Sequence, residues 1–236
     1  MGHLNNTNCS LSRGAFTGVR NLAAATICAW IRSDNDQNNS FFCVGTNSLG
    51  SQARIGMMRN GSFELVVRGR APDGSQNTTN STLGIPTSGT RYHVACVVNV
   101  AGDVQQIYVN GQLDISAAAA FTPTAFDNTD CGGAALMANP DGTSDESDGW
   151  GEDYRIYNRV LSAAEIETIF NCRGHDGIWF GLLNRWRVIE GAPGVAITVA
   201  NSVKDLGNNG NHMSPNVGSG GPQWDYSYIS GKRRFR

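Results

Sequence analysis

The sequence lacks any apolar run that approaches the roughly 18–20 residues a helix needs to cross a bilayer. We therefore expect no membrane insertion. The first residues, MGHLNNTNCS, have no basic start followed by an apolar core, so no secretory signal peptide is predicted. The expectation that follows is synthesis in the cytoplasm.

A strong charge of either sign is absent as well. The 18 Lys and Arg residues nearly balance the 20 Asp and Glu residues, which gives a formal net charge of −2 at pH 7. A chain so close to neutral has no strong overall attraction for nucleic acid. Nucleic acid is therefore not an expected partner.

Closely spaced cysteine pairs are missing. The sequence has 6 cysteines, but no two form a C-x-x-C pair, which disfavours a zinc knuckle or a thiol redox motif. Cys28 and Cys96 lie in apolar runs, where a thiol behaves as a small buried hydrophobe. The even count leaves disulfides open, although without a signal peptide reduced thiols are favoured.

Signatures of catalysis are also missing. The sequence contains neither the E-x-D-x-x-E spacing of glycosidases that use paired carboxylates on one strand nor a G-x-S-x-G nucleophile elbow. Glu152 and Asp153 are adjacent, so on a strand they are expected to point to opposite faces. His93 lies in an apolar run and is expected to be a hydrogen-bonded core residue. We therefore expect no enzymatic activity.

Turn formers and short apolar runs are abundant instead. The chain has 29 glycines and 40% hydrophobic residues, a mixture typical of all-β proteins. The runs 26–32 and 92–98 predict buried strands. Asn60–Gly61 and Asn110–Gly111, each between strand-like runs, predict hairpins with two-residue turns. The polar stretches 71–90 and 142–151 are expected to be surface loops.

One helix is predicted after a short strand near residue 154. Ser162 and Glu165 have the spacing of a capping box, and Leu161 with Ile166 can form a hydrophobic staple. Gly174 lies where a left-handed C-cap is expected. A single well-capped helix among many strands favours a two-sheet sandwich.

Four segments, taken in order, resemble one known family. Residues 29–31 are AWI, residues 92–95 are YHVA, residues 107–111 are IYVNG, and residues 153–166 combine the closing strand with the capped helix. Together they resemble the laminin-G-like domains of the concanavalin A-like lectin/glucanase jelly-roll family, with Tyr92 in place of the usual Trp. The resemblance covers about residues 10–172. It implies an all-β, two-sheet antiparallel jelly-roll sandwich with one short helix near 162–173.

The C-terminal quarter resembles a motif that in this family usually precedes the core strands. The matching positions are Trp186, Glu190, Gly194, Asp205 and residues 208–211. We therefore expect residues 1–175 to form the sandwich core and residues 176–236 to complete the sheet, as in a circular permutant. This segment completes either its own sheet or that of a neighbouring subunit.

An acidic loop predicts a calcium site. Carboxylates in surface loops supply the oxygen ligands that calcium prefers, and the family resemblance implies calcium near a sugar site. The predicted ligands are Asp145, Asp148 and Glu152, with Asp34 and Asp36 as a weaker second pair. The alternative is that these side chains are only solvated.

Sugar binding requires an exposed aromatic plane. Trp150 lies between glycines in the acidic loop, and Trp224 and Tyr226 follow a glycine-rich turn, so these three are the predicted glycan-binding residues. Trp30 and Trp186 are expected in the core instead.

A basic tail closes the sequence. Lys232, Arg233, Arg234 and Arg236 are predicted to dock on an acidic partner surface within a larger assembly. The resemblance extends to phage proteins, and it implies a non-enzymatic capsid decoration or appendage subunit at the virion surface that also contacts glycans. The alternatives are a soluble carbohydrate-binding lectin-like module and, less favoured, a polysaccharide-cleaving enzyme.

Overall fold

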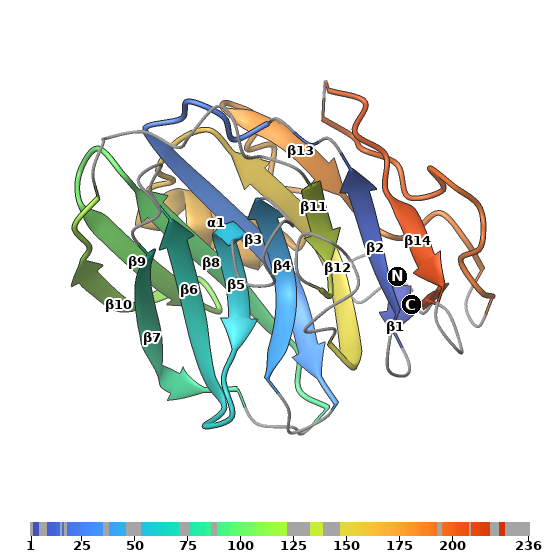
Figure 1. The fold of residues 1–236 in the computed structure, drawn as a ribbon, viewed down its shortest axis with the longest axis horizontal. Helices are drawn as coiled ribbons and strands as arrows, with labels where there is room; N and C mark the ends of the chain where they lie inside the picture. The colour runs from blue at the N-terminus through green and yellow to red at the C-terminus, as the bar shows by residue number, and fades with distance from the viewer. Residues whose placement is uncertain are drawn as a thin grey trace, which may run out of the picture.

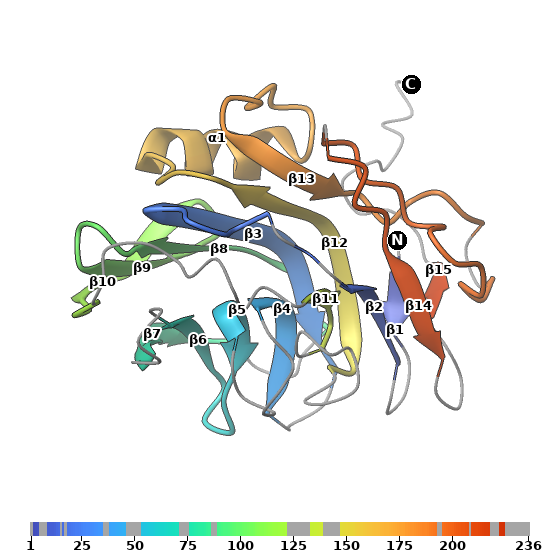
Figure 2. The same ribbon diagram turned by 45° about the horizontal axis from the view of Figure 1, so that its top comes forward.

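The computed structural model describes residues 2–4, 9–14, 16, 18–34, 38–45, 53–70, 76–85, 89–121, 133–138, 147–192, 195–207, 209–217 and 222–224. Two antiparallel sheets pack face to face, as Figures 1 and 2 show. We name them sheet A and sheet B. The predicted two-sheet sandwich is confirmed.

Sheet A has eight strands in the order β10-β9-β8-β3-β12-β1-β15, with β13 also paired to β12. Its strands are β1 (Gly2–Leu4), β3 (Ala24–Ser33), β8 (Tyr92–Asn99), β9 (Val104–Val109), β10 (Gln112–Ala118), β12 (Gly149–Tyr157), β13 (Leu182–Trp186) and β15 (Pro222–Trp224).

Sheet B has seven strands in the order β14-β2-β11-β4-β5-β6-β7. Its strands are β2 (Cys9–Gly14), β4 (Asn39–Gly45), β5 (Ala53–Arg59), β6 (Glu64–Arg70), β7 (Gln76–Gly84), β11 (Gly133–Leu136) and β14 (Ser214–Val217).

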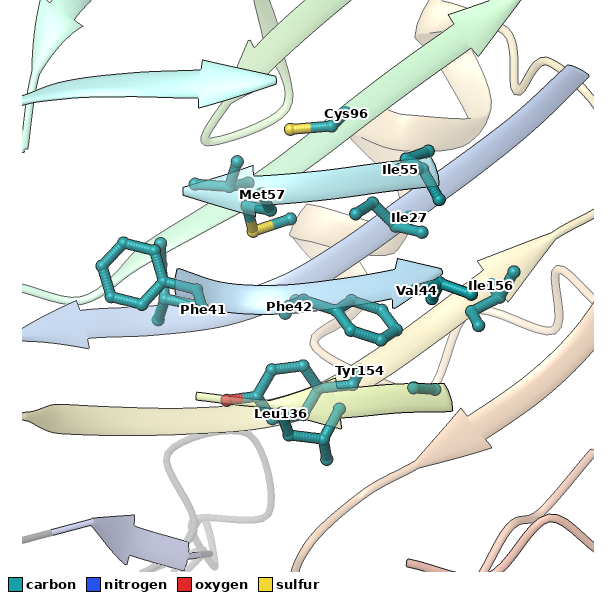
Figure 3. Close-up of a cluster of buried hydrophobic side chains, with 14 of the residues drawn as sticks. Ile27, Phe41, Phe42, Val44, Ile55, Met57, Cys96, Leu136, Tyr154 and Ile156 are labelled. Atoms are coloured by element: carbon teal, nitrogen blue, oxygen red, sulfur yellow. The ribbon is translucent and has the colours of Figure 1, made fainter. Parts of the chain in front are cut away.

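The main core lies between the sheets, because alternate residues of each strand point inward. Figure 3 shows side chains of β4 and β5 together with those of β3 and β12 in this layer. Phe42 contacts the rings of Tyr154 and Trp186, with centroids 5.4 Å and 6.1 Å apart. Trp186 comes from the C-terminal quarter, so that segment contributes to the central core.

The helix α1 (Ala163–Cys172) begins as predicted, since Ser162 and Glu165 form a capping box. Arg173, at φ 45°, is the C-cap, so the left-handed conformation starts one residue before Gly174. Ile166 and Ile169 pack with Leu161 on the outer face of sheet A, where they meet side chains of β3 and β8. Figure 2 shows this helix lying over the sheet.

The two predicted hairpins differ in their turns. Asn110 and Gly111 both have positive φ, and Val109 pairs with Gln112, so the two-residue turn is confirmed there. The turn at Asn60 is longer than predicted, because positive φ falls on Phe63. The Asn60 Oδ1 accepts hydrogen bonds from the Ser62 and Glu64 amides, which stabilises the longer loop.

The expected loop over residues 71–90 is wrong in its middle, because Gln76–Gly84 forms β7 at the edge of sheet B. Only Thr79 and Ser81 of this strand are buried. A polar edge strand carries little hydrophobic pattern and resists pairing with another chain, so its sequence resembles that of a loop. Likewise, the expected loop over 142–151 gives way at Gly149 to the buried strand β12.

The C-terminal quarter adds strands to both sheets of its own chain. β13 pairs with Tyr154–Tyr157 of β12, β14 pairs with β2, and β15 pairs with β1. The outer edge of β13 is covered by Asp205, whose carboxylate accepts hydrogen bonds from the Arg185, Gly207 and Asn211 amides and from Asn184 Nδ2. Residues 195–199 have a strand-like sequence, but they do not form a strand in the structure.

Candidate functional site

A pocket opens on the outer face of sheet B. It has a volume of about 210 Å³ and is lined by Asn38, Met58, Arg59, Asn60, Val66 and Arg68. Met58 and Val66 are direct cross-strand neighbours on β5 and β6 and pack with Cys43 in a small apolar cluster. This cluster forms the floor, separate from the main core. Figure 1 shows β4, β5 and β6 side by side.

The strand register creates the space above that floor. Arg68 on β6 pairs with Gly56 on β5, and Gly56 pairs with Cys43 on β4. Because Gly56 has no side chain, nothing from β5 stands between Arg68 and Cys43 on this face. Arg68 therefore has no side-chain neighbour from β5 in its own row.

The polar groups around the pocket are of two kinds. Asn60 is already engaged, because its Nδ2 donates to Glu64 Oε2 at 2.7 Å. Arg59 Nη1 donates to the Ile85 carbonyl oxygen at 3.3 Å. Among the described residues, by contrast, the side chains of Arg68 and Asn38 have no hydrogen-bond or ion-pair partner, and the Arg68 Nε is buried. These two side chains are the ones available to a ligand.

A second cluster of charges lies on the outer face of sheet A, and it is internally complete. Arg155 on β12 and Arg185 on β13 are directly opposite in register. Asp153 lies between them: its Oδ2 accepts from Arg155 Nη2 at 2.5 Å and its Oδ1 from Arg185 Nε at 2.6 Å. Asp176 accepts two further hydrogen bonds from Arg155. We call these four residues the buried ion cluster.

Charge pairing controls the pKa values in this cluster. Burial by itself raises the pKa of the Asp153 carboxyl, but the guanidinium groups of Arg155 and Arg185 hold it below its ordinary value. Burial acts in the same direction on Asp176, and its hydrogen bonds to Arg155 likewise lower its pKa. Both carboxylates are thus charged near neutral pH and serve to bind arginines, which leaves them unavailable as acids or bases.

A β-bulge explains how Asp153 reaches this face. Glu152 pairs with Trp30 and Arg155 with Cys28, so β12 has one more residue than β3 in this interval. Asp153 has a φ of 53°. The expected opposite orientation of Glu152 and Asp153 is therefore wrong, because the bulge keeps Asp153 on the same outer face as the residue before it.

The predicted calcium ligands do not converge. Glu152 is fully buried within β12, and it lies four positions along the chain from Asp148, which is about 13 Å of extended backbone. No group of three potential metal ligands occurs within the described part of the chain. The Asp34 amide does donate to the Asp148 carbonyl oxygen at 3.0 Å, which brings the two candidate loops together. Asp145 and Asp36 lie outside the described residues.

The predicted exposure of Trp150 is wrong. Its ring is buried in β12, where it packs with Trp30 and lies 4.0 Å from the Arg91 guanidinium carbon. The flanking glycines belong to a strand here, so they did not indicate a loop. Trp30 and Trp186 are buried as predicted.

Several predicted residues lie outside the described parts. Nothing is described of the Trp224 side chain, of Tyr226, or of the basic tail residues Lys232, Arg233, Arg234 and Arg236. The most exposed aromatic residues of the described part of the chain are Trp179 and Phe180, at 55% and 80%. The sequence contained a signal for them, since two adjacent aromatics follow a glycine after the helix.

His93, which the sequence predicted to lie in the core, and His212 are both structural. Burial, reinforced by the charge of Arg155, lowers the pKa of His93 to about 3. His93 is in the core as predicted, but its Nδ1 has no hydrogen-bond partner in the described structure. The His212 Nδ1 accepts from the Asp205 amide at 3.0 Å and so helps to close the C-terminal turn.

Comparisons with known proteins agree with this architecture. The family model described as "Concanavalin A-like lectin/glucanases superfamily" matches residues 5–167. A putative carbohydrate binding protein from Bacteroides ovatus is 19% identical, with a TM-score of 0.65 over 92% of this chain and 57% of that one. No curated protein matches the sequence.

Two further solved structures share the fold. The Ruminococcus gnavus IT-sialidase CBM40 bound to α2,3 sialyllactose is 18% identical, with a TM-score of 0.57 over 72% of this chain and 96% of that one. The heptameric SAP-like pentraxin from Limulus polyphemus is 15% identical, with a TM-score of 0.55 over 73% and 81%. At these identities the likeness establishes the fold and leaves the site to be argued from this chain.

Proposed function

The chain belongs to the concanavalin A-like lectin/glucanase superfamily, and from this premise we propose that it is a non-catalytic carbohydrate-binding module. Of the similar structures, the Bacteroides ovatus protein is described as a putative carbohydrate binding protein. The Ruminococcus gnavus CBM40 is bound to α2,3 sialyllactose. Their likeness makes glycan binding the function class to test first. The site must come from the residues of this chain.

The pocket on sheet B is the observation that carries the proposal. A sugar ring has apolar C–H faces and polar edges, and this pocket combines the apolar floor of Met58 and Val66 with the polar groups of Asn38 and Arg68. Its volume of about 210 Å³ is below the ~300–1,000 Å³ typical of sites that enclose drug-sized ligands. It therefore suits one sugar unit of a longer chain.

The lining also favours binding over cleavage. Glycoside hydrolysis uses two carboxyl groups that flank the scissile bond. Among the described residues that line the pocket there is no Asp or Glu. The buried Asp153 and Asp176 are held by arginines on the other sheet. A binding role without catalysis is accordingly part of the proposal.

A glycan array with a pocket-blocking variant tests this function. Asn38 is exposed at the pocket, so Asn38→Trp should fill the opening without disturbing the core. We expect the wild-type protein to bind a set of glycans and Asn38→Trp to lose them. Asn158→Trp, at an exposed position just after β12 and outside the described pocket lining, is the matched control and should bind normally. Equal binding by all three proteins would refute the pocket as the site.

The finer proposal of a virion decoration or appendage subunit rests on the family resemblance and the basic tail. It predicts that the protein co-purifies with virus particles at a fixed copy number, and that deletion of residues 231–236 weakens this association without unfolding the sandwich. Within the described residues, no helix is long and apolar enough to span a membrane. Calcium dependence is also a proposal, tested by repeating the array with a chelator.

A further inference from the structure

We infer that the sheet B pocket selects a sugar that carries a carboxylate, with Arg68 as its ionic partner. This inference rests on the proposed glycan-binding function and adds the chemical class of the ligand. It begins from the charge of the described lining residues, which include two arginines and two asparagines but no Asp or Glu. A ligand there meets a positive field over an apolar floor.

Within the described part of the chain, Arg68 lacks the acidic partner that four other arginines have. Arg155, Arg185, Arg159 and Arg32 each form an ion pair with an Asp or Glu. Among the described residues Arg68 has no such partner, and its Nε is buried without a hydrogen bond. A buried N–H of a charged group without an acceptor is unfavourable. An anionic oxygen from a ligand would supply that acceptor.

The shape of the guanidinium favours a carboxylate over a neutral hydroxyl. Its planar fork can donate two parallel hydrogen bonds to the two oxygens of one carboxylate. Arg68 lies on β6, hydrogen-bonded between β5 and β7, where its register partners are Gly56 and Thr78. The backbone that carries the guanidinium is therefore held on both sides, and Gly56 places no side chain beside it.

The Glu64 carboxylate, which contacts the lining residue Asn60, already has hydrogen-bond donors. Glu64 Oε2 accepts from Asn60 Nδ2 at 2.7 Å and from Asn80 Nδ2 at 3.0 Å. These amides orient the carboxylate toward the hairpin, so it does not pair with Arg68. Arg59 contributes charge but is tied to the protein, since its guanidinium carbon lies 5.2 Å from the centre of the Phe63 ring. Arg68 is thus the specificity-determining residue.

Matched sugars that differ only in charge test the inference. Isothermal titration with trigalacturonic acid and with its methyl ester compares the same ring with and without the anion, and 3′-sialyllactose against lactose gives a second pair. We expect the wild-type protein to bind at least one acidic member tenfold or more tightly than its neutral partner. The affinity for that acid should fall as salt is raised from 50 to 500 mM, because the contact is ionic.

Variants of Arg68 locate the contact. Arg68→Gln should lower the affinity for the acidic sugar at least tenfold and abolish the preference over the neutral partner, whereas Arg68→Lys should retain part of both. Arg20→Gln is the matched control, because Arg20 also has a buried Nε without a described partner but is outside the pocket lining. It should bind like wild type.

Each remaining outcome contradicts a specific statement. Equal affinity for acid and ester, or preference for the neutral sugar, would overturn the carboxylate class while glycan binding stands. A preference for the acid that survives Arg68→Gln would overturn the assignment to Arg68. A protein that binds neither these sugars nor any glycan on the array would refute the proposed function together with this inference.

Discussion

The outer faces of the two sheets use arginine in opposite ways. On sheet A, Arg155 and Arg185 are buried and fully occupied by Asp153, Asp176 and a backbone carbonyl. On sheet B, Arg68 borders a pocket in which none of the described lining residues carries a carboxylate. Arginine stabilises the fold on sheet A, where Asp153 and Asp176 supply the carboxylates. On sheet B, we propose that Arg68 binds a carboxylate supplied by the ligand.

Local backbone geometry decides which role applies. The bulge at Asp153 places an acidic side chain directly between two arginines that are opposite in register. At Arg68 the register partner is Gly56, and the strand alternation is regular. The buried ion cluster also fastens β13 and the segment after the helix to β12. Its loss should therefore damage stability, while loss of Arg68 should damage binding alone.

The largest expected effect is on the buried ion cluster. Asp153→Asn removes the carboxylate shared by Arg155 and Arg185 and leaves two buried cations undercompensated, so the free energy of unfolding should fall by about 3–5 kcal/mol. Urea denaturation measures this. The control is Asp34→Asn, which breaks an Arg–Asp pair of the same sequence spacing that is partly exposed, and it should cost less than about 1 kcal/mol. Equal losses would contradict the account of burial.

A smaller loss of stability is expected at Asp205. Its carboxylate accepts three backbone amides and the Asn184 side chain, and Asp205→Asn turns part of that acceptor into a donor. Leaving buried donors unpaired should cost about 1–3 kcal/mol. Hydrogen exchange should show faster exchange at the Arg185 and Leu206 amides, with β3 and β8 unaffected at first. Uniform acceleration across the sandwich would mean that the C-terminal quarter does not unfold separately.

The free energy of unfolding should also depend on pH, through His93. Because the pKa of His93 falls from 6.5 to about 3 on folding, the unfolded chain binds a proton there before the folded chain does. Stability should therefore be complete above pH 6.5 and decline as the pH falls toward 3. Urea midpoints at pH 7, 5 and 4 should show this decline, and His93→Phe should flatten it. The carboxylates of the buried ion cluster make stability depend on pH only below their ordinary pKa of 3.8, because folding lowers both pKa values.

The smallest expected effect on stability is at the pocket. Arg68 has no partner to lose among the described residues, so Arg68→Gln should change the free energy of unfolding by less than about 0.5 kcal/mol. The same urea experiment measures it beside Asp153→Asn. A loss of several kcal/mol would show that Arg68 is structural, like its counterparts on sheet A.

Local patterns in the sequence predicted the features that depend on neighbouring residues. The capping box at Ser162 and the turn at Asn110 were predictable because their determinants lie within four residues. The pocket was not, since it depends on the register of β4, β5 and β6, which brings Cys43, Gly56 and Arg68 into one row. Register is set by the packing of whole strands.

The wrong sequence predictions also concern features that depend on contacts between distant strands. Trp150 between glycines resembled an exposed loop aromatic, but its burial depends on β3 and α1, which supply Trp30 and Phe170 beside it. The bulge at Asp153 left no mark in the sequence that alternation could detect. The polar β7 was missed because an edge strand with one buried face of Thr79 and Ser81 needs no apolar pattern.

The central claim is that Arg68 forms its ion pair with a carboxylate of the bound sugar. Nuclear magnetic resonance of arginine side chains tests this claim most directly. The Nε–Hε signal of Arg68, assigned by its absence in Arg68→Lys, should shift and saturate during titration with whichever acidic sugar binds, and should stay in place with the neutral partner. The signals of Arg155 and Arg185 should not move in either titration. An Arg68 signal that remains fixed when the acidic sugar has saturated the protein would contradict the claim.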